Sequence, residues 1–76
     1  MMDHFIEYLA DIGLSLATPD TWTAGEPDGE GIIVFQSPQS SIRFSLYHDV
    51  ILDGRIAFED LVTIPSWVPT SLNVRK

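Results

Sequence analysis

The sequence contains no cysteine among its 76 residues. Disulfide bonds, thiolate metal sites and cysteine nucleophiles are therefore excluded, and a chain of this kind fits a reducing compartment. No apolar run is long enough to cross a bilayer, and the first residues, MMDHFIEYLADIG, lack the basic segment of a signal peptide. We therefore expect a cytoplasmic protein that does not bind membranes.

Positive charge is scarce as well. Four Lys and Arg residues stand against eleven Asp and Glu residues, for a net charge of −7. Residues 1–42 hold seven of these acids and no Lys or Arg, whereas residues 43–76 hold four acids and four bases. The excess negative charge thus belongs entirely to the first part. Because such a chain repels nucleic acid and anionic lipid, we expect neither as a direct partner.

The composition favours one small folded domain over residues 1–76. Its hydrophobic content of 45% is too high for a disordered acidic tail. A domain of this size buries only about 60% of the surface that its unfolded chain exposes. Oligomerisation or docking on a partner is a common source of additional stability at this size, and a homodimer is one such solution.

The first segment predicts an amphipathic helix over residues 4–12, with Asp3 as its N-cap and Gly13 as its stop. Apolar side chains recur along one arc, which should face the core. They are Met2, Phe5, Ile6, Leu9 and Ile12. On the opposite side, carboxylates recur every four residues with no nearby Lys or Arg. They are Asp3, Glu7 and Asp11.

Beyond the helix, the apolar pattern predicts strands at about 31–36, 41–51 and 55–62, followed by an extended tail at 64–76 that contains proline and Trp67. A short edge strand at 21–24 and an acidic loop at 25–31 precede them. The fold class is therefore α+β, with an N-terminal helix packed on a three- to four-stranded antiparallel meander.

The alternation of the second strand assigns a face to each side chain. A turn at 37–40 sets Ile33 and Phe35 opposite Phe44 and Ile42 on the inner face, and the same phase turns His48 inward. A three-residue loop at 52–54, with Gly54 in the left-handed region, then connects to the next strand. The outer face receives four sizeable apolar residues: Ile32, Val34, Tyr47 and Ile51.

No motif for catalysis, cofactor binding or metal binding is present. The acidic loop around Asp28 lacks the twelve-residue ligand pattern of an EF-hand, and no nucleophile elbow, phosphate loop or dinucleotide fingerprint occurs. His48, on a core-facing position, is more typical of a hydrogen-bonded structural residue than of a general base. We expect no enzyme activity, no cofactor and no metal.

The unpaired acids of the helix favour a protein-binding function. Carboxylates of one sign on one surface steer association with a basic partner, and proteins with cationic grooves mostly handle nucleic acid. The hypothesis is an inhibitor or regulator that mimics nucleic acid, of the kind found in phages and other mobile elements. The candidate partner-binding residues are Asp3, Glu7, Tyr8, Asp11, Glu26, Asp28 and Glu30.

Other interpretations stay open. The acids also suit a solvated face that only keeps the chain soluble. A structural or self-assembling subunit would join copies through the outer sheet face or a strand edge, and an antitoxin-like or adaptor protein would be recognised through its tail. The alternative interface residues are Ile32, Val34, Tyr47, Ile51 and Trp67.

Overall fold

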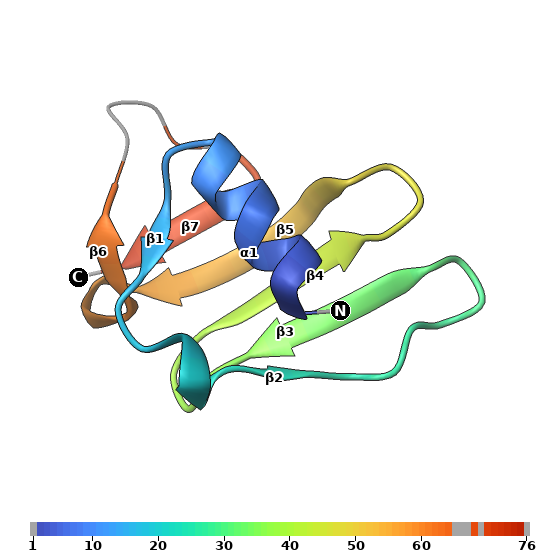
Figure 1. The fold of residues 1–76 in the computed structure, drawn as a ribbon, viewed down its shortest axis with the longest axis horizontal. Helices are drawn as coiled ribbons and strands as arrows, with labels where there is room; N and C mark the ends of the chain where they lie inside the picture. The colour runs from blue at the N-terminus through green and yellow to red at the C-terminus, as the bar shows by residue number, and fades with distance from the viewer. Residues whose placement is uncertain (1, 65–67, 69, 76) are drawn as a thin grey trace.

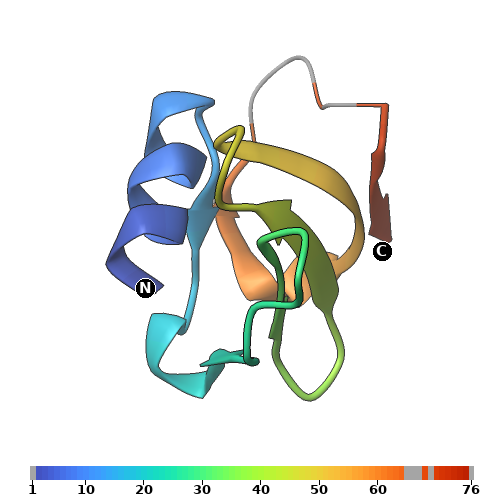
Figure 2. The same cartoon turned by 90° about the vertical axis from the view of Figure 1, so that its right-hand side faces the viewer.

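The computed structural model describes residues 2–64, 68 and 70–75. One helix, α1 (Met2–Asp11), lies over one face of a sheet that has five strands in the described residues (Figure 1). The view turned by 90° shows the helix on one side, with the strands of this sheet, the C-terminal strand included, on the other (Figure 2). The strands of the large sheet, in spatial order, are β2 (Thr23–Ala24), β3 (Ile32–Gln36), β4 (Ser41–Ser45), β5 (Val50–Ala57) and β7 (Leu72–Arg75).

A second, two-stranded sheet joins β1 (Ser15–Leu16) to β6 (Leu61–Thr63). The 3₁₀ turn η1 (Pro19–Thr21) lies between β1 and β2, and the 3₁₀ turn η2 (Phe58–Asp60) lies between β5 and β6. The α+β class is thus correct, but the simple antiparallel meander is wrong. Strand β7 pairs with β5 in parallel, and β6 leaves the large sheet to pair with β1. A parallel pair needs a crossover connection, and the chain between β5 and β7 supplies it.

The helix ends where the sequence indicates. Gly13 has a φ of 92°, the left-handed value that a glycine adopts without a Cβ penalty. Its N–H donates to the Ala10 carbonyl at 3.1 Å, and the Leu14 N–H donates to the Leu9 carbonyl at 2.8 Å. These two bonds close a Schellman motif. At the other end α1 begins at Met2, so Asp3 lies in the first turn and is not the N-cap.

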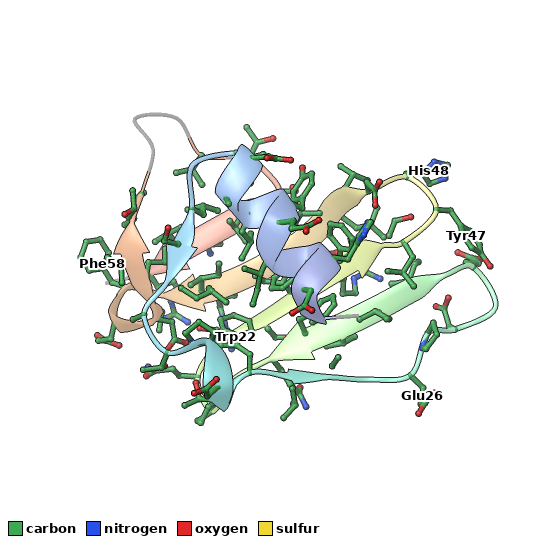
Figure 3. All side chains as sticks on the ribbon, in the orientation of Figure 1. Trp22, Glu26, Tyr47, His48 and Phe58 are labelled. Carbon is green, nitrogen blue, oxygen red and sulfur yellow. The ribbon has the colours of Figure 1, made fainter. Side chains whose placement is uncertain are left out.

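The hairpin of β3 and β4 has the predicted register. Ile33 lies opposite Phe44 and Phe35 opposite Ile42, and all four side chains are fully buried. Beyond β4, however, the single predicted strand over 41–51 is wrong, because a turn at residues 46–49 separates β4 from β5. This turn, labelled at Tyr47 and His48 in Figure 3, reverses the chain and moves His48 from the predicted inner face to an exposed position.

The predicted loop at 52–54 is also wrong, because β5 runs straight through it. Arg43 pairs with Asp53 and Phe44 with Ile51, so Leu52 is the extra residue of a β-bulge. The bulge changes the face on which the following side chains lie. Ile51 lies before the bulge and opposite Phe44, because the turn at 46–49 begins a new strand in a new phase. Its side chain points into the core, with 5% of its surface exposed, so its predicted place on the outer face is wrong.

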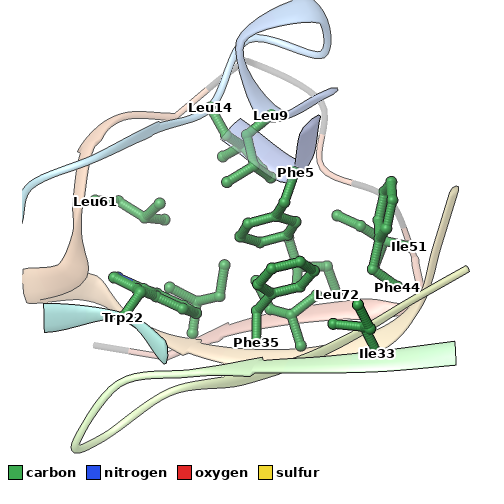
Figure 4. Packing of buried hydrophobic residues seen from close by; sticks show 12 residues of the cluster. Phe5, Leu9, Leu14, Trp22, Ile33, Phe35, Phe44, Ile51, Leu61 and Leu72 are labelled. Atoms are coloured by element: carbon green, nitrogen blue, oxygen red, sulfur yellow. The ribbon is translucent and has the colours of Figure 1, made fainter. Parts of the chain in front are cut away.

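The core lies between α1 and the large sheet (Figure 4). The ring of Phe5 stacks on that of Phe35 with centroids 4.1 Å apart, and Phe44 meets both rings edge to face. The indole of Trp22 closes one end of the cluster, and in the described part of the chain its buried Nε1 has no hydrogen-bond partner. The buried hydrophobic residues are Phe5, Leu9, Leu14, Trp22, Ile33, Phe35, Ile42, Phe44, Ile51, Ile56, Leu61 and Leu72. Met2 was also predicted to face the core, but its side chain lies outside the described part.

Candidate functional site

The carboxylates of α1 lie on its exposed side, as the spacing predicts. Phe5 and Leu9 point into the core, which turns Asp3, Glu7 and Asp11 toward solvent. In the described residues, none of these three carboxylates has a hydrogen-bond or ion-pair partner. The helix thus presents a row of uncompensated negative charge.

The turn between β4 and β5 adds a fourth acid, Asp49, which sequence reasoning did not include. Asp49 adopts a φ of 49°, a left-handed conformation that Asp tolerates better than most residues. His4 Nε2 donates a hydrogen bond to Asp49 Oδ1, and this contact ties the turn to the first turn of α1. A long-range contact of this kind has no signal in the sequence.

These groups surround one shallow depression of about 200 Å³. It is lined by His4, Glu7, Tyr8, Asp11 and Asp49. We define the helix-face acidic patch as Glu7, Asp11 and Asp49. Tyr8 is half-buried and packs its ring edge-on against Phe44, with centroids 5.2 Å apart, so an aromatic side chain is held beside the acids.

The other predicted partner-binding acids do not line this depression. Asp28 Oδ1 accepts hydrogen bonds from the N–H groups of Glu30 (2.8 Å) and Ile32 (3.0 Å), so its carboxylate shapes the loop that it belongs to. Glu26 and Glu30 are both exposed in that loop, and Figure 3 shows Glu26 near the end of the β2–β3 hairpin. The structure therefore groups Glu7, Tyr8 and Asp11 and leaves the loop acids as a separate region.

The alternative interface residues are scattered. Ile32 is half-buried, Val34 is 36% exposed and Tyr47 is 72% exposed, with its ring lying over the backbone of Gly31. Ile51 is part of the core. Trp67 lies outside the described residues. These positions form no joint surface comparable with the acidic patch.

The one buried carboxylate of the described residues has a structural role. Asp60 accepts hydrogen bonds from Ser40 Oγ (2.5 Å), Ser37 Oγ (2.7 Å) and Gln39 Nε2 (3.3 Å). Burial alone would raise the pKa of Asp60, but the three hydrogen bonds outweigh it and hold the pKa below its ordinary value of 3.8. Asp60 thereby joins the 37–40 turn to η2 and is not available as a catalytic acid.

Charge pairing on the sheet involves Arg43 and Asp53, which lie opposite each other on β4 and β5. Arg43 Nε donates to both carboxylate oxygens of Asp53 at 2.9 and 3.0 Å, and Nη2 adds a further contact. This hydrogen bonding lowers the pKa of Asp53 and raises that of Arg43. Both side chains are therefore ionised and paired at neutral pH.

The described residues show neither a candidate metal site nor a membrane-spanning helix. Among them, no three His, Asp or Glu side chains come close enough to hold a metal ion. Nor does any helix in this part of the chain have the length and apolar character that crossing a membrane requires. Comparison with protein-family models, curated proteins and solved structures finds no match for the chain.

Proposed function

We propose that this protein is a small protein-binding module that docks its helix-face acidic patch on a basic surface of a partner. The observation that supports this most is the grouping of Glu7, Asp11 and Asp49 around one depression, from two segments far apart in the sequence. The described arginines lie on β4, β5 and β7 and none of them lines it.

The physical case rests on the unpaired charges of Glu7 and Asp11 beside a fixed aromatic ring. Glu7 and Asp11 are one turn apart on the helix and repel each other by a few tenths of a kcal/mol, and a cationic surface would turn this cost into attraction. Tyr8, held against Phe44, offers apolar contact with a polar end, a combination typical of interface cores. Charge of a single sign also accelerates association with an oppositely charged partner and makes the association rate depend on the salt concentration.

The class of partner follows from the charge. Basic grooves occur mainly in proteins that bind nucleic acid, so we propose an inhibitor or regulator that competes with the phosphate backbone. The proposal describes a binding protein without catalytic activity or cofactor. It also places the protein in the cytoplasm, where such partners work.

The test compares two charge-matched triple variants. Glu7→Gln, Asp11→Asn and Asp49→Asn together remove the patch, whereas Asp20→Asn, Glu26→Gln and Glu30→Gln remove three exposed acids elsewhere. Both changes raise the net charge by the same amount. Immobilised wild-type protein should retain a basic protein from lysate of the native cell and block its binding to a labelled oligonucleotide.

The proposal expects the patch variant to lose at least about tenfold in apparent affinity and the control to stay within about twofold of wild type. Raising the salt concentration should weaken the wild-type complex steeply. Equal losses in both variants would indicate general charge attraction, and full retention by the patch variant would rule the surface out.

Self-association is the second candidate, supported by the exposed Val34 beside half-buried Ile32 on β3. A Val34→Asp variant separates it from the first. If sedimentation shows a dimer that is insensitive to salt and that dissociates in this variant, assembly through the sheet is the function. A monomer under all conditions excludes it.

A further inference from the structure

The far face of the large sheet carries two arginines that the acidic patch does not involve. In the parallel pair of β5 and β7, Ile56 and Leu72 point into the core. Because side chains alternate along a strand, Arg55 and Arg75 point to the face turned away from α1. Arg55 lies opposite Asn73 and Ala57 opposite Arg75, so the two arginines are diagonal neighbours across Ala57.

These side chains border a depression of about 190 Å³, which we call the arginine site. It is lined by Gln39, Arg55, Ala57, Glu59 and Arg75. Ala57, which has a small side chain, lies in this lining together with the two arginines. Gln39 is fixed at the rim, because its amide Nε2 donates to Asp60.

Both guanidinium groups are available for binding. The carboxylate two residues before Arg55 on the same face is Asp53, and Arg43 already pairs with it through several hydrogen bonds. In the described residues, neither Arg55 nor Arg75 has a hydrogen-bond or ion-pair partner. Two unpaired arginines thus share one concave site in a chain with a large excess of acids.

We propose that the arginine site binds the phosphate group of a small molecule. Guanidinium groups present forked N–H donors that match phosphate oxygens, and two of them together balance the charge of a phosphate dianion. A carboxylate, with two oxygens and one charge, would engage one guanidinium fully and leave the other unpaired.

The surroundings favour a small ligand over a polyanion. The net charge of −7 repels long phosphate chains at a distance. A small molecule with a single phosphate carries fewer negative charges, so the protein repels it less. Glu59 limits the affinity, because its carboxylate stands beside the bound anion.

The test titrates inorganic phosphate into the ¹⁵N-labelled protein at low ionic strength and follows the Arg Nε–H signals and the Ala57 amide. Saturable shifts should appear at the arginine site alone. Arg55→Gln or Arg75→Gln should each weaken binding about tenfold, and Glu59→Gln should tighten it about threefold. Both arginines are exposed, so these variants should fold, which circular dichroism verifies.

The control is Ala10→Glu, an exposed helix position that lowers the net charge by the same amount as Arg55→Gln. It should leave phosphate binding within about twofold of wild type. A second titration with methyl phosphate distinguishes the two sources of the phosphate group. Tighter binding of methyl phosphate than of inorganic phosphate indicates a phosphate ester as the ligand, whereas equal or tighter binding of inorganic phosphate indicates the free ion. Linear shifts without saturation, unchanged binding in both arginine variants, or acetate binding as tightly as phosphate would overturn the proposal. None of these results bears on the helix-face acidic patch.

Discussion

At the scale of single residues, Gly54 shows how a correct local signal leads to a wrong structure. An Asp-Gly pair between apolar segments usually marks a tight turn, yet here it lies within β5. A Cβ on Gly54 would be 3.0 Å from Ile42 Cγ1, Leu72 Cδ1 and the Ser41 carbonyl oxygen. The glycine therefore lets three strands approach closely, which is a property of the neighbours and not of the adjacent sequence.

Replacing Gly54 by alanine should consequently destabilise the fold. We expect Gly54→Ala to lower the free energy of unfolding by about 1–3 kcal/mol, because the added methyl group meets two side chains and a backbone oxygen at once. Urea denaturation measures this directly. Gly29→Ala is the matched control, since a Cβ there has nothing within 4 Å; equal effects of the two substitutions would contradict the packing role.

Asp60 predicts a specific dependence of stability on pH. Its folded-state pKa lies below the ordinary 3.8, so the unfolded chain takes up the proton first as the pH falls. The stabilisation from Asp60 is therefore complete above about pH 4 to 5 and is lost as the pH drops through 3.8 toward the folded-state value.

Asp60→Asn should reduce stability at pH 7 by about 1–3 kcal/mol, because the amide cannot accept all three hydrogen bonds. The difference in the free energy of unfolding between wild type and this variant should become smaller as the pH falls from 4 to 2. Urea unfolding at each pH measures it. Asp20→Asn, at an exposed site, should show neither effect. A gap that is constant with pH would show that the carboxylate charge is not what the serines stabilise.

At the scale of secondary-structure elements, those with a clear local sequence pattern could be predicted. Helix α1 follows from its apolar arc and Gly13, and the β3–β4 hairpin follows from the alternation around a short polar turn. Strands β5 and β7 could not be placed in the same way. The register of β5 depends on a bulge at Leu52, and the parallel pairing of β7 depends on a crossover that periodicity does not reveal.

Strand β7 contributes to the core through Leu72. Leu72 is 4% exposed and contacts the position of Gly54. Leu72→Ala should cost about 2–5 kcal/mol in the free energy of unfolding, as expected for a buried leucine. Asn73→Ala, the exposed neighbour, should change it by less than about 0.5 kcal/mol. If both variants unfold at the same urea concentration, β7 does not contribute to the core.

At the scale of the whole molecule, the fold separates the charges. The acids of α1 and Asp49 lie on the helix side, whereas Arg55 and Arg75 lie on the far face of the sheet. The sequence already placed the excess acid in its first part, and the helical spacing placed Glu7 and Asp11 together. It could not include Asp49 or exclude the loop acids, because both depend on how distant segments fold together.

The measurement that tests the helix-face acidic patch most directly is an interface map by NMR. The ¹⁵N-labelled protein is titrated with the basic protein that wild type retains, at low and at high salt. Amide shifts should concentrate at residues 4–11 and 47–50 and become smaller as the salt concentration increases. Shifts centred on residues 32–34 of the outer sheet, or shifts that salt leaves unchanged, would contradict it.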